Sequence, residues 1–318
     1  MIARASFAER RHPHVRPIDP WRDGRALADL LESAFADETL DESSSRMLHR
    51  LRYYGSFDLI TFGLGTGFVW VEGGELLGSA SIQRNPTRRD TWIIGNVATR
   101  ADHRNRGIGR TLVETCIEYA AARKARYVAL QADITNAPAL HLYEKLGFEH
   151  LIQVTHYLRA PVRAQRVVYE DDGLVRSARW SDRATVLALA QANISPLATF
   201  AESFDSNVYR LGFRWWLFNS LSGNPEAWHV AEDGSGAVRT RVNYEGSYHH
   251  LELLLDADSD EETALALVAQ GLKRFELFLS KPIYAAHARP HERVHSALQA
   301  QGFRPLRTLT HMRLTLQT

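Results

Sequence analysis

Three arginines surround a pair of glycines in the stretch RNRGIGRTL, which runs from Arg104 to Leu112. An apolar, helix-periodic segment follows at once, so the glycines stand between a predicted strand and the first turn of a predicted helix. Glycines allow the backbone N–H groups to point one way, and a helix start adds unpaired N–H donors and the positive end of its dipole. A turn of this kind binds phosphate. The alternative for the stretch alone is a solvated glycine turn.

Two other phosphate-binding motifs are excluded by the same residues. The third glycine of a dinucleotide fingerprint is absent, and no Gly-Lys-Ser/Thr is present for a nucleoside triphosphate loop.

Periodicity and turn residues predict the elements that must position this turn. Apolar runs on both sides of Gly73-Gly74 predict a hairpin, and Gly147 is a predicted helix C-cap. We expect helices over 25–36, 108–123 and 137–146, and strands over 68–72, 76–84, 92–99, 127–132 and 148–158. The single cysteine, Cys116, lies on the apolar stripe of the middle helix, where we expect it to fill the core. The order predicts an α/β unit with a mixed (α+β) sheet, antiparallel at first and with a later β-α-β crossover.

The chain repeats itself. Gly147-Phe148 recurs as Gly302-Phe303, and Thr155-His156 recurs as Thr310-His311, in each case 155 residues later. The starts also match, because HVRPIDPWRD and LVRSARWSD both carry Val-Arg, a short turn, Trp and an Asp two residues after it. We therefore predict two copies of one unit, over 14–160 and 174–318, joined by a linker over 161–173.

The amino-acid composition limits the classes of protein to which the chain can belong. The 318 residues are 45% hydrophobic and 24% charged with a net charge of +1, so no charge excess favours nucleic acid. One cysteine permits no internal disulfide and favours a reducing cytoplasm. No apolar run reaches the length of a membrane span, and the basic N-terminal stretch lacks the apolar core of a signal peptide. We expect a soluble cytoplasmic protein without a nucleic-acid or membrane partner.

Residues 92–148 resemble the GCN5-related N-acetyltransferase (GNAT) family. The stretch NVATRADHRNRGIGRTL is similar to that family's acetyl-CoA motif, and NAPALHLYEKLGF, from Asn136 to Phe148, is similar to the motif that closes its site. Both stand in the family's order and spacing. The resemblance implies two tandem GNAT-like units, acetyl-CoA as the cosubstrate and no metal.

The resemblance also implies roles for individual residues. Asn136 would touch the pantetheine arm, and Tyr143 would lie near the thioester sulfur as the acid that protonates the leaving thiolate. An amide N–H near Ala98 would polarise the carbonyl. The remaining cofactor-binding residues are Val97, Ala98 and Thr99 for pantetheine, and Arg104, Asn105, Arg106, Gly107, Ile108, Gly109 and Arg110 for the pyrophosphate.

Spacing supports one part of this independently. Asn136 and Tyr143 are seven residues apart, nearly two helical turns, so they share a face. The structural alternatives are a helix N-cap at Asn136, ahead of Pro138, and a core position for Tyr143.

The general base is the weak point of the resemblance. Relatives with Leu-Glu before the asparagine can use that glutamate through water, but LQADITN places Gln131 there, and glutamine accepts no proton at neutral pH. Asp133 is two residues on and faces the same side of the strand, so it is the candidate base. Relays of water and main-chain carbonyls are the alternative.

The second copy has lost the motif. The aligned turn reads SDEETA, from Ser259 to Ala264, without glycine and with acids that repel pyrophosphate. Leu298 stands where Tyr143 does in the first copy, so activity is expected in the first copy alone. Three histidines four apart, His287, His291 and His295, are interpreted as surface residues because Pro290 interrupts their helix, and no metal site is expected.

Hints about the acceptor are few. Four acids after the first helix could attract a cationic amine, or form a solvated loop: Asp37, Glu38, Asp41 and Glu42. Three aromatics of the second copy could pack the copies together or cover the acceptor site: Trp215, Trp216 and Phe218.

We expect an acetyl-CoA-dependent N-acetyltransferase that acts on a small-molecule or peptide amine, as a monomer or homodimer. The alternatives are a longer acyl chain, a hydroxyl acceptor, or a non-catalytic acyl-CoA sensor or interaction protein.

Overall fold

A computed structural model describes residues 12–34, 66–162, 173–201, 209, 211, 225–244, 247–278, 280–288 and 292–316. The chain forms two compact units. Unit 1 comprises Met1–Leu151, Phe200–Ser203 and Thr310–Thr318, and unit 2 comprises Ile152–Thr199 and Phe204–Leu309. The predicted copy boundaries at 160 and 174 remain a prediction.

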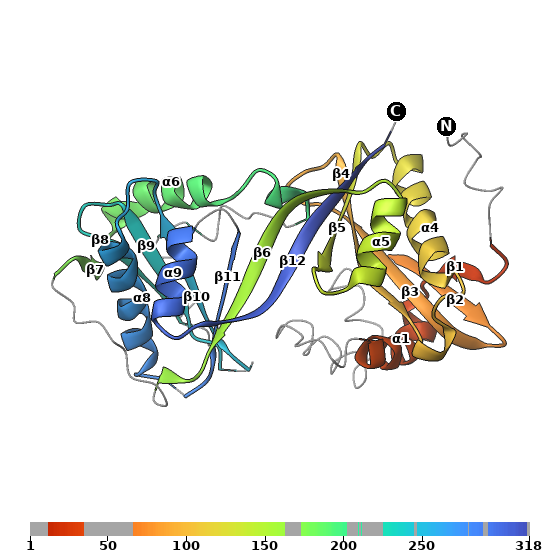
Figure 1. Cartoon of the computed structure of the whole chain (residues 1–318), viewed down its shortest axis with the longest axis horizontal. Helices are drawn as coiled ribbons and strands as arrows, with labels where there is room; N and C mark the ends of the chain where they lie inside the picture. The colour runs from red at the N-terminus through yellow and green to blue at the C-terminus, as the bar shows by residue number, and fades with distance from the viewer. Residues whose placement is uncertain are drawn as a thin grey trace. The chain divides into compact units, whose positions relative to one another are not determined.

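Unit 1 is a mixed sheet with helices on both faces (Figure 1). Its strands β1 to β4 are antiparallel neighbours, and β4 and β5 are parallel. The strand order is β1 (Val15–Pro17), β2 (Gly67–Glu72), β3 (Glu75–Arg84), β4 (Thr91–Thr99), β5 (Tyr127–Asp133) and the second half of β12 (Arg304–Thr315). The helices are α1 (Pro20–Ala34), α4 (Ile108–Ala122) and α5 (Ala137–Lys145), with the short helix η1 (Ala101–His103) after β4.

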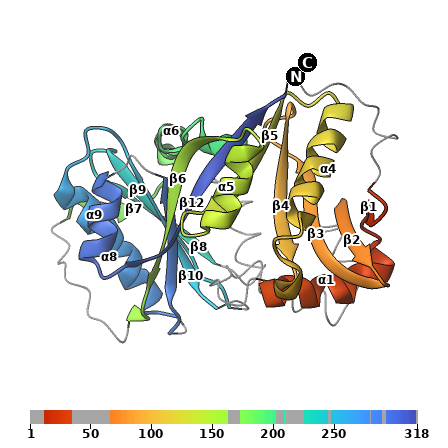
Figure 2. The ribbon, with the colours of Figure 1, turned by 45° about the vertical axis from the view of Figure 1, so that its right-hand side comes forward.

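The two faces of this sheet follow from strand alternation. Phe68 and Trp70 of β2 are buried in the cluster that includes the apolar stripe of α4, whereas Val69 is buried with α1. Figure 2 shows α4 running alongside β3 and β4. The α4 stripe includes Cys116, which is 0% exposed as expected, and burial raises the pKa of its thiol.

Unit 2 repeats this architecture. Its strands lie in the order β6 (Glu149–Arg159), β11 (Ile283–Ala288), β10 (His249–Leu255), β9 (Gly236–Arg241), β8 (Glu226–Ala231) and β7 (Val175–Ser177). Among them β10 and β11 are parallel. Its helices are α6 (Arg183–Asn193), α8 (Glu261–Phe275) and α9 (Glu292–Ala300), with short helices η3 (Trp180–Asp182) and η4 (Ala198–Phe200). The mixed α/β class in two tandem units is therefore confirmed.

An ion pair explains the motif repeated at the start of each unit. Arg16 donates two hydrogen bonds of 2.6 Å to the carboxylate of Asp23, and Arg176 donates to Asp182 at 2.7 and 3.0 Å. Both carboxylates lie near the start of the unit's first helix, so each pair ties the first strand to that helix. The repeated tryptophan takes no part in the core, because Trp21 and Trp180 are 77% and 62% exposed.

Strand β12 is divided between the units. Residues 304–309 belong to unit 2, where Thr308 shares a 3.1 Å hydrogen bond with Thr155 of β6. Residues 310–318 belong to unit 1, where Met312 is 0% exposed in the core under α4. The backbone N–H of Leu316 donates to the carbonyl of Arg126 at 2.9 Å. Unit 1 is thus completed by residues far along the chain.

The predicted elements of the first copy are confirmed with shifts of a few residues at their ends, and Gly147 ends α5 at φ +88°. The sequence also predicts an apolar helical stripe in the second copy: Leu265, Val268, Leu272, Phe275 and Leu279. Helix α8 contains all of it except the last residue. Within the described ranges, no helix is both long and apolar enough to cross a bilayer. Other predicted features fall outside the described residues: the acidic loop with Asp37, Glu38, Asp41 and Glu42, the aromatics Trp215, Trp216 and Phe218, most of the linker, and His291 and Leu279.

Close contact between β3 and α4 generates a prediction. A Cβ on Gly78 would lie 2.7 Å from Ile108 Cγ2 and 3.1 Å from Leu112 Cδ1, so only glycine lets the helix start approach the strand. We expect Gly78→Ala to lower the free energy of unfolding by about 1–3 kcal/mol through overpacking. Denaturant titration measures the change. Gly95→Ala is the control, because its Cβ would meet Ser81 Oγ at an ordinary 3.4 Å. Equal losses in the two variants would contradict the packing argument.

Candidate functional site

The parallel ladder between β4 and β5 is short. It joins Thr91–Ile94 of β4 to Tyr127–Leu130 of β5. Beyond these residues the two strands are not paired with each other, although β4 continues to Thr99 and β5 to Asp133. Residues Gly95–Thr99 and Gln131–Asp133 are therefore not paired with each other, and the space between these two unpaired stretches is called the opening here. Predicted site residues on both strands line it.

A β-bulge bends β4 at this point. Its register with β3 shifts between Ser79 and Ser81, and Asn96 adopts φ +50°. Asn96 Nδ2 donates to Ser81 Oγ at 3.0 Å, and Ser79 Oγ donates to the Asn96 carbonyl at 3.2 Å. Ser81 Oγ in turn donates to the Gly95 carbonyl at 2.9 Å. These bonds hold the bulge, which the sequence did not predict.

Backbone groups of β4 face the opening. The N–H of Arg100 donates to the Leu77 carbonyl of β3, so alternation directs Ala98 to β3 as well. Val97 and Thr99 then present their N–H and C=O groups to the side of β5. Val97 and Thr99 thus have backbone groups on the side of β5, and their pairing with pantetheine stays a prediction, while the Ala98 side chain is buried against α1.

The glycine turn leads into α4 as predicted. Asn105 and Gly107 adopt φ +62° and +81°, and Gly107 is the N-cap. The first helical bond runs from Thr111 N–H to the Gly107 carbonyl, so the N–H groups of Ile108, Gly109 and Arg110 have no acceptor within the helix. Three adjacent donors at the positive end of a 15-residue helix suit an anion.

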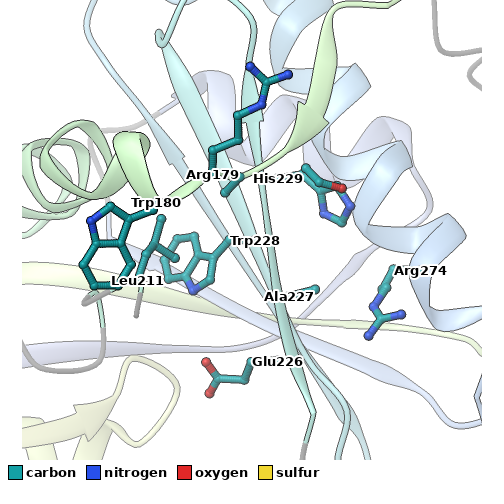
Figure 3. Close-up of a pocket in the computed structure, with 10 residues that line it drawn as sticks. Arg179, Trp180, Leu211, Glu226, Ala227, Trp228, His229 and Arg274 are labelled. Carbon is teal, nitrogen blue, oxygen red and sulfur yellow. The ribbon is translucent and has the colours of Figure 1, made fainter. Parts of the chain in front are cut away.

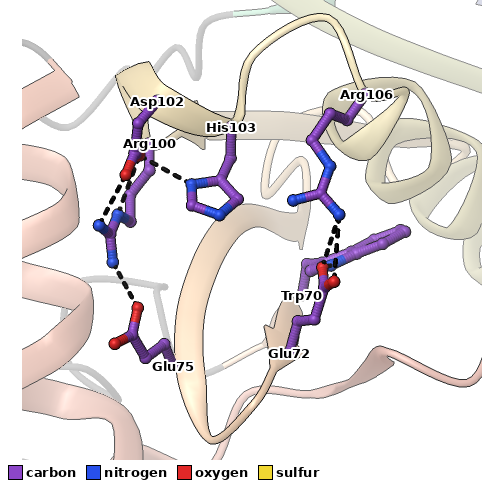
Figure 4. A network of polar contacts seen from close by, with 7 residues as sticks. All are labelled: Trp70, Glu72, Glu75, Arg100, Asp102, His103 and Arg106. Carbon is purple, nitrogen blue, oxygen red and sulfur yellow. Dashed lines mark hydrogen bonds and ion pairs between the residues drawn. The ribbon is translucent and has the colours of Figure 1, made fainter.

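Two of the three arginines of the turn are already paired with carboxylates. Arg106 donates to both oxygens of Glu72 at 3.1 Å (Figure 4), and Arg110 donates to Glu114 at 2.9 Å. The hydrogen bond from Arg106 is the main reason that the pKa of Glu72 is lowered. Arg104 is exposed, and no carboxylate pairs with it in the part of the chain that the structure describes.

A second network lies beside the first. Arg100 donates to Glu75 at 2.7 Å and to Asp102 at 2.9 Å, as Figure 4 shows. His103 lies 2.8 Å from Asp102, and its hydrogen bond, followed by that of Arg100, lowers the pKa of Asp102 to about 2. The residues ahead of the turn are therefore held by charge-assisted bonds.

On the other side of the opening, the predicted residues of β5 and α5 have structural partners. Asn136 caps α5 by accepting from Ala139 N–H at 3.2 Å, the alternative considered from the sequence. Asp133 Oδ1 accepts from the N–H and Oγ of Thr135 at 2.8 and 2.7 Å, which fixes the turn before α5. Whether Asn136 also touches a cofactor, and whether Asp133 is a base, remain predictions.

Tyr143 lies on α5 at the edge of the core. Its side chain is 6% exposed and packs edge-on against Phe148 with ring centroids 6.0 Å apart. Its neighbour Leu142 approaches the turn, because a Cβ on Gly109 would lie 4.0 Å from Leu142 Cδ2 and 3.6 Å from Thr99 Oγ1. The end of β4, the start of α4 and the middle of α5 therefore meet at Gly109.

The corresponding helix start in unit 2 carries an acidic cap. Asp260 caps α8 by accepting from Thr263 N–H at 2.7 Å, and this backbone bond is the main cause of its lowered pKa. The carboxylate thus occupies the helix N-terminus with its own negative charge.

Unit 2 also contains a pocket of about 410 Å³, which borders residues Ser177 to Trp180 of the repeated motif LVRSARWSD. Figure 3 shows that Arg179, Glu226 and Arg274 point in different directions, so its charges do not converge on one ligand group. It is lined by Ser177, Ala178, Arg179, Trp180, Leu211, Glu226, Ala227, Trp228, His229 and Arg274.

The chain is similar to known acetyltransferases in sequence and in fold. Residues 25–148 match the family model described as the acetyltransferase (GNAT) family. A mycothiol acetyltransferase of Acidothermus cellulolyticus is 32% identical over 148 residues, which are 43% of this chain and 44% of that protein. An L-2,4-diaminobutyric acid acetyltransferase of Shouchella clausii is 27% identical over 40% of this chain and 65% of its own length. The chain thus matches less than half of the first relative.

Solved structures share the fold over nearly the whole chain. A GCN5-related N-acetyltransferase from Sphaerobacter thermophilus superposes with a TM-score of 0.66 at 14% identity and covers 96% of both chains. A tandem GNAT protein from the clavulanic acid biosynthesis pathway has a TM-score of 0.60 at 14% identity, covering 96% of this chain and 98% of its own.

The pairing of Arg106 generates a prediction. Because Arg106 must leave Glu72 to reach a bound phosphate, Glu72→Gln should tighten the binding of inorganic pyrophosphate by about 2–5-fold at low salt. Calorimetric titration measures the dissociation constant. Glu75→Gln is the matched control, since its arginine partner lies ahead of the turn, and it should leave the affinity unchanged. Tighter binding that persists undiminished in 0.5 M salt, a condition of about 4 Å Debye length, would argue against the electrostatic explanation.

Proposed function

The chain belongs to the acetyltransferase (GNAT) family, and we propose on that premise that unit 1 transfers the acetyl group of acetyl-CoA to an amine. One observation carries the proposal: the opening between β4 and β5 lies next to the unpaired amides that begin α4. A molecule with a pyrophosphate at one end and a thioester at the other can place the first on α4 and the second in the opening. The amine acceptor is a small molecule or a peptide.

The reaction is a direct attack. The neutral amine nitrogen forms a bond to the thioester carbonyl carbon, the C–S bond breaks, and the amine loses a proton while the thiolate gains one. The N–H groups of Val97 and Thr99 that face the opening are the donors available to the carbonyl oxygen, a variation on the expected donor near Ala98. Tyr143, held by packing against Phe148, supplies the proton to the thiolate.

Removal of the amine proton has no single assigned residue. Asp133 Oδ1 is engaged with Thr135, so Asp133 acts through its second oxygen or not at all. A water relay to main-chain carbonyls of the separated strands is the alternative that we retain. Gln131, in the place of the expected glutamate, also favours the second candidate function, an acyl-CoA sensor without turnover.

Acetyl-CoA binding is the first test. Calorimetric titration should find one site per chain, and Gly107→Glu should abolish it, because the new carboxylate would lie among the amides that hold the pyrophosphate. Gly173→Glu is the control: Gly173 has φ +83°, close to the +81° of Gly107, and both have open space around a Cβ, but Gly173 lies in unit 2. Absence of binding to the wild-type chain would refute the proposal.

The role of Tyr143 is tested separately. We expect Tyr143→Phe to lower kcat by about 100-fold or more, because one general acid typically contributes about 10²–10⁴-fold, while the dissociation constant of acetyl-CoA changes less than about twofold. Thiol release in the presence of an amine panel measures kcat. Unchanged turnover would remove Tyr143 as the acid. Binding without turnover for any amine would favour the sensor.

A further inference from the structure

Gln131 is the first residue of β5 beyond the paired ladder, so its side chain lies at the start of the opening. Its neighbours in the strand, Leu130 and Ala132, are buried in the core beneath α4. Alternation therefore places Gln131 on the opposite face, with Ala129 and the cluster that contains Ala201.

Strand β12 brings an imidazole to the same face. Met312 is buried beneath α4, so His311 projects from the other face of the strand. His311 Nε2 lies 3.2 Å from Gln131 Nε2, and the imidazole side chain is 0% exposed. Two residues 180 positions apart are thus in contact within unit 1.

A second contact of Gln131 indicates the orientation of its amide. Gln131 Nε2 donates to the carbonyl of Ala201 at 3.5 Å. A carbonyl oxygen only accepts, so the nitrogen of the carboxamide, and not its oxygen, faces Ala201 and His311. In this orientation His311 Nε2 accepts the hydrogen bond, which requires the tautomer with its proton on Nδ1.

We propose that His311 is a positioning residue, which holds the Gln131 carboxamide at the opening so that Gln131 orients the acceptor amine. This inference rests on the proposed function. In the proposed function the cofactor pyrophosphate binds at the start of α4, on one face of the sheet. The acceptor can then approach from the other face, and Gln131 lies on that other face. A carboxamide takes no proton at neutral pH, so its contribution is orientation of the nucleophile rather than proton removal.

The repeat supplies a comparison within the same chain. His156 stands 155 residues before His311, and in unit 2 it lies opposite Ala286 and hydrogen-bonds to the hydroxyl of Tyr284. Ala286 occupies the position of Gln131. The repeated histidine is thus present in both units, but only in unit 1 does it contact a carboxamide on the neighbouring strand of the described chain.

Four variants test the proposal by thiol release from acetyl-CoA with glucosamine, spermidine, L-2,4-diaminobutyrate or water as acceptor. His311→Phe removes the hydrogen-bond acceptor and keeps a ring, whereas His311→Gln places an oxygen near the Nε2 position. We expect His311→Phe to lower kcat/KM for the acceptor by about tenfold or more, with the KM of acetyl-CoA within about twofold. His311→Gln should recover to within about threefold of wild type. Gln131→Leu should match His311→Phe, and the double variant should be no worse than either.

His156→Phe is the matched control and should leave the acceptor kinetics unchanged. The proposal is overturned if His156→Phe impairs the enzyme as much as His311→Phe does, if His311→Gln gives no rescue, or if the effects of His311→Phe and Gln131→Leu multiply. Equal losses in acetyl-CoA and acceptor kinetics would indicate a structural role and would also overturn it.

A spectroscopic measurement needs no turnover. Long-range ¹H–¹⁵N spectra of the imidazoles should show His311 protonated at Nδ1, with an Nε2 resonance that moves in Gln131→Leu. Protonation at Nε2, or no shift in the variant, contradicts the pairing. Failure of the proposed function is recognised separately, because the wild-type chain would then bind no acetyl-CoA.

Discussion

The separation of two parallel strands is the constraint on which the site depends. One extra residue in β4, marked by Asn96 at φ +50°, ends the ladder after Ile94 and frees the backbone of Val97 and Thr99. Strand backbone without a partner costs free energy unless another group satisfies it. The polar side chains of Ser79 and Ser81 hold the bulge, so the N–H groups of Val97 and Thr99 stay unpaired with β5.

The two units differ in what meets the start of the equivalent helix. In unit 1 the cap is Gly107, which has no side chain, so the amides of α4 stay accessible. In unit 2 the side chain of Asp260 satisfies Thr263 N–H and brings a negative charge. A single choice of cap residue thus separates a helix start that attracts an anion from one that repels it, although the sheets behind them share one strand order.

Much of this could be predicted from the sequence, because the signals were local. Periodicity located the strands and helices around the glycine turn, and the spacing of repeated pairs revealed two copies. The bulge at Asn96 was missed, since two serines and an asparagine in a strand carry no local sign of a register shift. The contact of Gln131 with His311 could not be predicted either. These residues are 180 positions apart, and only the order of the strands in the sheet brings them together. The same applies to Phe200, whose carbonyl accepts from Asn85 Nδ2.

The division of β12 has a consequence for biosynthesis. Domains generally fold in the order of synthesis, N-terminal first. Unit 1 has to wait, because residues 310–315, which supply its last strand, follow all of unit 2 along the chain. Until then β5 has an unpaired edge, and such an edge can pair with other chains. The nascent chain therefore carries unit 1 without its last strand until all of unit 2 has been synthesised.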